Sequence, residues 1–330
     1  MPTVGEVDQG DLFIPESQLM SLVFHIVAVL AMFLISLSGL FVNLFLFNKF
    51  AKKPGKASGF HKLCLAKTIP NSIVCTAFFV WGVPLALFQP DYENVPRWLN
   101  VFIGQLAGFG AYVTGPLLQC CMSCNRFAVL YFSTRLLKVT QYPITGMAII
   151  GVFLVAVIYT SLGFRPGNCG FVFYPSTFTW DREDSTCAAG MSTLIFYTVV
   201  GVATSTNILN MMTAAKLSVD KVGGMSQSDS NRRRKKVVQM FIQSVIQDCL
   251  HVIDLINSIF VFKLYDALWF QFIFLSISFL MIHALDGFVM FFFHPEVHPS
   301  FLQSKASKGT LVTIVPQSFL VDRKFTVPSF

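Results

Sequence analysis

Histidine and aspartate recur at one spacing in two apolar stretches of the chain. Asp254 follows His251 by three residues, and Asp286 follows His283 by three residues. Imidazole and carboxylate are ordinary zinc ligands, so two such pairs could suggest a metal site. The same groups also form hydrogen bonds when they are buried between packed elements. The choice between these two chemistries depends on the elements that carry the pairs.

Those elements are predicted to be membrane-spanning helices. The 330 residues are 54% hydrophobic and only 12% charged, with a mean hydropathy of +0.63. This composition excludes a soluble globular protein, because too little polar surface is available to cover a body in water. About 20 mostly apolar residues cross a bilayer. Seven stretches qualify, at about 19–47, 63–88, 101–123, 144–163, 188–212, 237–262 and 267–293. The predicted fold class is all-α, an integral membrane seven-transmembrane helix bundle.

Depth along these helices separates the two pairs. Counted from one membrane face, Asp254 lies at about 25 Å and Asp286 at about 10 Å. Asp248 and His283 both lie at about 15 Å, which predicts a hydrogen bond between the sixth and seventh spans. We therefore expect no metal. The candidates for an interior polar switch are Asp248, His251, Asp254, His283 and Asp286.

The basic residues predict the orientation of the bundle. Nineteen of the 24 Lys and Arg residues fall in the segments 48–62, 124–143, 213–236 and 294–330. Positive charge near span ends is retained on the cytoplasmic side. The sequence therefore predicts an extracellular N-terminus (1–18), a seven-span receptor domain (19–293) and a cytoplasmic tail (294–330). Lys67, only four residues into its predicted span, is expected to snorkel to the cytoplasmic interface rather than to find an interior partner.

Two of the eight cysteines are placed for a disulfide. Cys169 and Cys187 both lie in the loop that is predicted to face the oxidising side, whereas the other six fall within spans or at cytoplasmic ends. A bridge between them would close a lid over the outer ends of the spans. The alternative is a pair of free thiols.

Catalytic motifs are absent from the sequence, so we expect neither an enzyme nor a cofactor. There is no His-Glu-x-x-His, no Gly-x-Ser-x-Gly and no Gly-rich phosphate loop. Seven dissimilar spans do not show the paired repeats that are common in transporters. Only the sixth span approaches the polar helix that a channel pore requires. A ligand receptor that signals to an internal protein fits best, with a ligand-gated channel or a transporter as alternatives.

The end of the third predicted span carries a receptor-like motif. Asn125-Arg126-Phe127 resembles the Asp/Glu-Arg-Tyr motif of rhodopsin-like G-protein-coupled receptors, and Gly39 with Asn43 also resembles that class. The resemblance does not extend to an acid before Arg126 or to prolines in the last three spans. An ionic lock and a proline-hinged sixth helix are therefore not predicted.

A more specific resemblance covers about residues 20–295. The chain is similar to the nematode serpentine receptor class X (Srx) family of chemoreceptors, a family of seven-helix G-protein-coupled receptors with the N-terminus outside. The segments that carry the resemblance, in the family's order, are 60–71 (FHKLCLAKTIPN), 125–127, 169–187, 232–236 and 283–287 (HALDG).

This resemblance implies partners and a location. It implies a chemosensory receptor of the plasma membrane of sensory-neuron cilia, which binds a small-molecule odorant or pheromone. The receptor would activate a heterotrimeric G protein through Asn125, Arg126 and Phe127. A peptide ligand is the alternative within the class. Membrane lipid is a further expected partner, and nucleic acid is not.

A run of five basic residues precedes the sixth span. It comprises Arg232, Arg233, Arg234, Lys235 and Lys236. Such a basic inner loop would contact an acidic protein surface or anionic lipid of the inner leaflet. The alternative is that the run acts only as a topology signal.

Overall fold

Long apolar runs form the helices of the structure, a computed structural model that describes residues 16–52, 59–132, 144–219 and 227–294. Seven helical stretches within these residues are long and apolar enough to cross a membrane. They are α1 (Glu16–Ala51); α2 (Gly59–Ala77), η2 (Phe78–Gly82) and α3 (Val83–Phe88); α4 (Arg97–Gly104), η4 (Gln105–Ala111) and α5 (Tyr112–Tyr131); α7 (Ile144–Leu162); α8 (Thr186–Val219); α9 (Gln227–Ile259); and α10 (Leu268–Gln271), η6 (Phe272–Ile277) and α11 (Ser278–Phe293). The predicted all-α bundle of seven spans is confirmed.

Several helices continue beyond the apolar runs from which they were predicted. The third span continues to Tyr131, and α9 begins at Gln227, before the predicted start of the sixth span at 237. Polar residues such as Arg and Gln are good helix formers, so a helix does not have to end where its apolar run ends. The predicted segments 1–18 and 294–330 lie almost wholly outside the described residues.

Three spans contain π-helical turns, which have wider hydrogen-bond rings than an α-helix. They are η2, η4 and η6. The second and third spans also contain Pro70 and Pro116. The seventh span has no proline, yet η6 interrupts it. π-Bulges and prolines are established causes of helix irregularity, so the seventh span is irregular without a proline signal.

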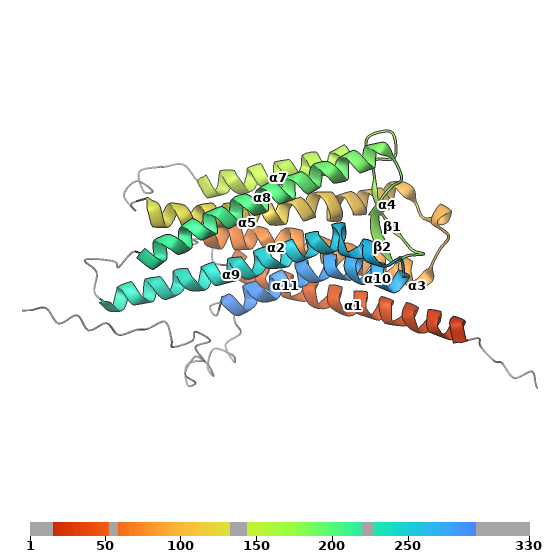
Figure 1. Ribbon diagram of the computed structural model, residues 1–330, viewed down its shortest axis with the longest axis horizontal. Coiled ribbons are helices and arrows are strands. Elements are labelled where there is room, and N and C mark those ends of the chain that lie inside the picture. Colours follow the sequence, from red (N-terminus) through yellow and green to blue (C-terminus); the bar gives the residue numbers. More distant parts are fainter. Residues whose placement is uncertain (1–15, 53–58, 133–143, 220–226, 295–330) are drawn as a thin grey trace, which may run out of the picture.

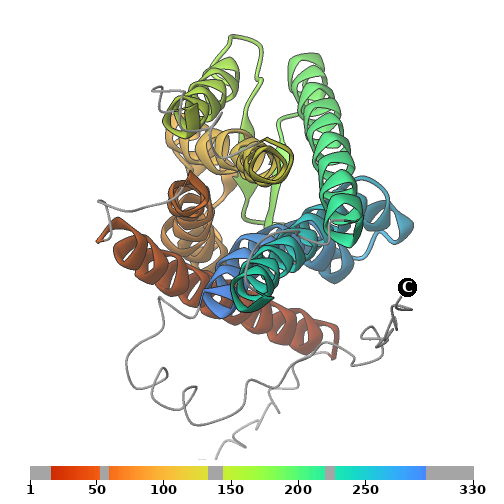
Figure 2. The same ribbon diagram turned by 90° about the vertical axis from the view of Figure 1, so that its left-hand side faces the viewer.

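The third span is the centre of the bundle. Its hydropathic window is 72% buried, against 11% for α7. α5 packs against α2, α7, α8 and α9, and α1 packs against α2 and α11. Figure 2 views the bundle nearly along its helices and shows α5 enclosed by its neighbours. A side chain that points inward from α5 can therefore reach several spans.

A β-hairpin covers one end of the bundle. β1 (Phe171–Tyr174) pairs antiparallel with β2 (Thr179–Arg182), and a disulfide joins Cys169 to Cys187 on either side of them. Figure 1 shows the hairpin beside α3, α4 and α10. We call this the hairpin end. The opposite end, where α5 finishes at Tyr131, is called the Arg126 end.

Aromatic side chains of the hairpin fill the mouth of the bundle. Phe173, Phe178 and Trp180 are each less than 5% exposed. Phe178 lies 5.8 Å from Phe24 of α1 and 6.1 Å from Phe272 of η6, between ring centroids. Burial of this much aromatic surface holds the loop firmly on the helices. The hairpin therefore acts as a plug rather than as a loose cover.

Polar contacts fix the hairpin to the third span. Asn100 accepts hydrogen bonds from Trp81 Nε1 at 2.9 Å and from Phe173 N at 3.0 Å, and it donates to Phe173 O at 3.0 Å. Glu183 receives two bonds from Arg97, at 2.7 and 2.9 Å, and one from Gly170 N at 2.8 Å. Removal of a buried amide side chain such as that of Asn100 is costly, because its hydrogen-bond partners are left unpaired.

We expect Asn100→Ala to destabilise the receptor by about 2 kcal/mol, since it strands three buried polar groups. Thermal unfolding of the purified protein, followed by tryptophan fluorescence, measures the loss. Asn94→Ala, at an exposed side chain of the preceding loop, is the matched control and should leave the melting temperature unchanged. Equal melting temperatures for the two variants would contradict a role for Asn100 in anchoring the hairpin.

Candidate functional site

A buried ion pair lies in the interior of the bundle. Lys67 Nζ of α2 lies 2.9 Å from Asp286 Oδ1 of α11, and both side chains are 0% exposed. The expectation that Lys67 snorkels to the membrane surface was therefore wrong. α2 begins at Gly59, eight residues before Lys67. Lys67 therefore lies about 12 Å from the start of the helix, and its side chain points toward the seventh span.

Three amide and imidazole side chains surround this pair. Asn71 Nδ2 donates to Asp286 Oδ2 at 2.7 Å and to Asn43 Oδ1 at 3.2 Å. His283 Nδ1 donates a hydrogen bond to Asn71 Oδ1 at 2.9 Å, because an amide oxygen can only accept. Asn43 Nδ2 donates to the carbonyl oxygens of Gly39 and His283. A buried charge pair is tolerated only with such supporting hydrogen bonds.

Gly287 makes this arrangement possible. It stands roughly where rhodopsin-like receptors have the proline of their seventh-span motif, and a Cβ at this position would lie 2.7 Å from Asn43 Nδ2. The absence of a side chain lets α1 and α11 approach closely enough for Asn43 to reach the seventh span. The departure from the rhodopsin-like pattern at this position therefore has a packing reason.

The ion pair is joined to the third and sixth spans by one glutamine. Lys67 Nζ donates to Gln119 Oε1 at 2.8 Å, and Gln119 Nε2 donates to Ser244 Oγ of α9 at 2.6 Å. Ser244 Oγ also accepts from Arg126 Nη2 at 2.5 Å. These contacts form an unbroken polar path from Asp286 to Arg126, which we call the interior chain.

Arg126 fastens α5 to α9. Arg126 is 4% exposed, and its guanidinium donates to Met240 O at 2.6 Å, in addition to Ser244. It also donates to Ser123 Oγ at 3.1 Å and to Met122 O at 3.2 Å within its own helix. All four acceptors are uncharged. The arginine therefore holds the sixth span without the acidic partner of an ionic lock.

The other two residues of the predicted coupling motif lie on different faces of α5. Phe127 stacks on Tyr131, with ring centroids 4.2 Å apart. Asn125 is partly exposed and lies close to the start of α2. A Cβ added at Gly59 would be 3.1 Å from Asn125 Oδ1. Only Arg126 of the three joins the interior chain.

The predicted hydrogen bond between Asp248 and His283 does not form. Asp248 instead accepts from Asn210 Nδ2 of α8 at 2.7 Å, while His283 bonds to Asn71. The two residues lie at similar depth, but depth does not determine the direction in which a helical side chain points. It is His251 of α9 that faces His283, with ring centroids 6.3 Å apart.

Asp254 belongs to a separate polar cluster. Its carboxylate accepts from Tyr112 Oη at 3.0 Å and from Ser278 Oγ at 2.7 Å. His251 Nδ1 bonds to the carbonyl of Gln247 on its own helix. The five interior switch candidates are thus separated. His283 and Asp286 lie at the ion pair, Asp248 bonds to α8, Asp254 lies in this cluster, and His251 lies beside His283. In the described part of the chain, no group of three or more His, Cys, Asp or Glu side chains is arranged to hold a metal ion.

Sequence reasoning missed Asn71, Gln119 and Ser244 as members of the site. A usable signal was present, because Asn71 follows Lys67 by four residues and shares its helix face. Gln119 and Ser123, also four apart, lead to Arg126 in the same way. The basic run 232–236 lies within α9, and its side chains are outside the described part of the structure.

The fold and this interior define a class of protein, a multi-pass membrane protein built like a G-protein-coupled receptor. Residues 33–294 match the serpentine-type 7TM GPCR chemoreceptor family Srx. Because the match covers most of the chain, the protein belongs to this family, which is a receptor class and not an enzyme class. The resemblance drawn from the sequence is confirmed. Comparison with curated proteins gives no match.

Removing one partner of the ion pair should cost more than removing both. We expect Lys67→Met and Asp286→Asn each to destabilise the receptor by about 3 kcal/mol or more, since each leaves a buried charge uncompensated. The double variant should be more stable than either single variant. Thermal melts of the four proteins form the cycle, with Lys263→Met, at an exposed lysine of η5 (Val261–Leu264), as the control. Simple additivity would show that the pair is not coupled.

Proposed function

We propose that the protein is a chemosensory receptor that binds a small-molecule odorant or pheromone and activates a heterotrimeric G protein. Its proposed location is the plasma membrane of sensory-neuron cilia. The observation that carries the coupling proposal is the Arg126 clasp, in which the central helix holds α9 through Met240 and Ser244. Membership of a chemoreceptor family supports the ligand-binding half of the proposal.

The proposed orientation places the hairpin end outside the cell. The Cys169–Cys187 disulfide requires an oxidising compartment, which favours this side for the hairpin. In Figure 1, α5, α8 and α11 finish at the Arg126 end, and the basic segments predicted to be cytoplasmic follow these helices in the sequence, in agreement with the positive-inside rule. Ligand would thus act from the outer half of the bundle, and the G protein would bind at the Arg126 end.

The interior chain supplies a physical route between the two halves. It joins the seventh, second, third and sixth spans through contacts of 2.5 to 2.9 Å. A ligand that favours a different packing of these spans shifts the population toward a state in which α9 is released. Arg126 then becomes free to meet the C-terminal helix of the G protein, and the run 232–236 lies near acidic protein or inner-leaflet lipid.

The neutral acceptors of the clasp make its release inexpensive. A hydrogen bond to a charged group contributes about 1.5–3 kcal/mol. None of the hydrogen-bond acceptors of Arg126 is a carboxylate, and Asp248 of α9 attracts the guanidinium only from a distance. A closed state held in this way responds to modest differences in ligand affinity between the two states. Signalling without an ionic lock is therefore physically reasonable for this receptor.

We expect Ser244→Ala to raise basal G-protein activation, by up to about tenfold, because it weakens the closed state by one charged hydrogen bond. Nucleotide exchange on a co-expressed G protein measures the effect, normalised to surface expression. Ser205→Ala is the matched control, since that exposed hydroxyl bonds within α8 to Gly201 O. Arg126→Ala should abolish activation. Unchanged activity in both Ser244→Ala and Arg126→Ala would overturn the coupling proposal.

A further inference from the structure

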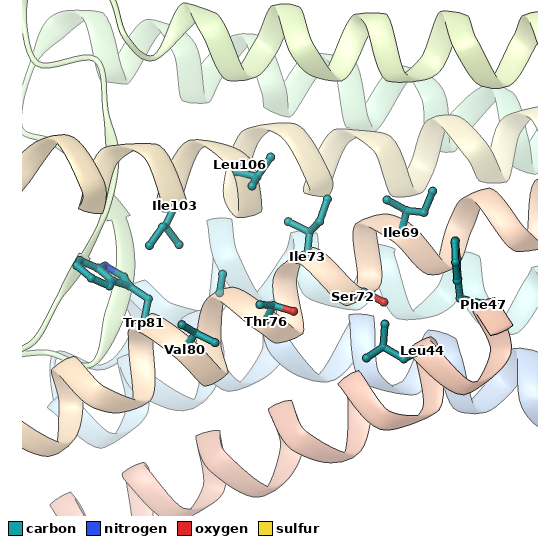
Figure 3. A pocket seen from close by; sticks show the side chains of 11 residues that line it. Leu44, Phe47, Ile69, Ser72, Ile73, Thr76, Val80, Trp81, Ile103 and Leu106 are labelled. Carbon is teal, nitrogen blue, oxygen red and sulfur yellow. The ribbon is translucent and has the colours of Figure 1, made fainter.

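A groove on the side of the bundle is lined by three spans. α1, the second span and the third span enclose a cavity of about 370 Å³. Figure 3 shows Ser72 and Thr76 of α2 between Leu44 and Phe47 of α1 and Ile103 and Leu106 of the third span. The volume falls within the range of small-molecule sites, and no charged side chain lines it.

The groove faces the hydrocarbon core of the membrane. Leu44 and Val80 at its rim are 51% and 57% exposed, as lipid-facing side chains are. Ser72 and Thr76 bracket the midpoint of the span Gly59–Phe88. Molecules dissolved in the bilayer therefore reach the groove, whereas the charged headgroups of lipids remain at the interface, far from its centre.

The two hydroxyls in the groove lack hydrogen-bond partners. Several hydroxyls in the spans bond to the carbonyl four residues earlier, as Thr160 does to Ala156 and Thr206 does to Val202, whereas Thr213 has no partner. Among the described residues, Ser72 and Thr76 make no such bond and no other. An unpaired hydroxyl is unfavourable in hydrocarbon. The pair is thus available to a groove occupant that carries an oxygen acceptor.

The hairpin closes one end of the bundle in this conformation, whereas the groove is open at its side. Phe173, Phe178 and Trp180 fill the mouth at the hairpin end and are buried. Trp81, at one end of the groove, donates to Asn100, the residue that anchors the hairpin. α2 also carries Lys67 and Asn71 of the ion-pair site, so a molecule that presses on the groove acts on the helix that begins the interior chain.

We propose that the groove is the binding site for the receptor's ligand, a lipophilic small molecule that enters from the bilayer. The ligand class is an uncharged apolar skeleton with an acceptor oxygen along its length, such as a ketone, ester or ether. The apolar walls take the skeleton, and Ser72 and Thr76 donate to the oxygen. This inference rests on the proposed chemoreceptor function and specifies its ligand class.

Photolabelling in a defined membrane tests the site. The receptor is placed in phosphatidylcholine nanodiscs with a straight-chain methyl ketone that carries a diazirine and a terminal alkyne. A matched hydrocarbon probe lacks the carbonyl. Mass spectrometry then locates the adducts. We expect the ketone to label the groove segments around 44–47 and 69–81 preferentially, and the hydrocarbon probe to label them much less.

Two variants separate the chemistry of the site from its shape. Ser72→Ala/Thr76→Val should lower groove labelling by the ketone about tenfold, through loss of two hydrogen bonds, without changing labelling by the hydrocarbon. Ile73→Trp should fill the groove and lower labelling by both probes. Thr193→Val/Ser205→Ala, at exposed hydroxyls of α8, is the matched control and should change neither.

Two outcomes overturn the proposal. The first is uniform labelling of all lipid-exposed spans by both probes, which would make the groove an ordinary annular lipid surface. The second is an unchanged ketone signal in Ser72→Ala/Thr76→Val. No G protein is present in this measurement, so its result does not depend on the result of the coupling assay. Preferential labelling without G-protein activation would refute only the proposed function, and activation without preferential labelling would refute only the groove.

Discussion

The buried pair of Lys67 and Asp286 constrains the rest of the interior. Two charges removed from water must lie together and must have their remaining hydrogen-bond capacity filled. This requirement fixes the rotation of α2 and α11 about their axes, brings Asn71 and His283 into contact, and requires Gly287 to admit Asn43. Within a membrane protein, whose packing has no hydrophobic drive between helices, such polar contacts do much to define the arrangement of the spans.

Different kinds of interaction close the two ends of the bundle. At the hairpin end, aromatic burial by Phe178 and Trp180 holds the loop in the mouth. At the Arg126 end, charged hydrogen bonds to neutral acceptors hold α9. Aromatic packing changes little with small movements of its neighbours, whereas a directional hydrogen bond is lost when its acceptor moves by an ångström. The proposed release of α9 at the Arg126 end therefore needs only a small movement, while the hairpin end stays packed.

Much of the architecture could be predicted from the sequence, because hydropathy shows which segments lie inside the membrane. The seven spans and the family were predicted correctly. Side-chain partners were not, as the separation of Asp248 from His283 demonstrates. Equal depth places two residues in one membrane layer, but each helix can turn its side chains to any neighbour in that layer. Lys67 was misplaced for a related reason, since its helix begins at Gly59, before the apolar run starts.

The sequence by itself determined that this chain is a membrane protein with seven spans and that it belongs to a chemoreceptor family. Composition, the length of apolar runs and local motifs can each be read from one segment at a time. Only the tertiary structure decided that Lys67 pairs with Asp286, that Gln119 connects them to Arg126, and that a groove forms beside Ser72. Each of these depends on how several helices are rotated relative to one another. That rotation is set by the packing of the whole bundle and is not contained in any single span.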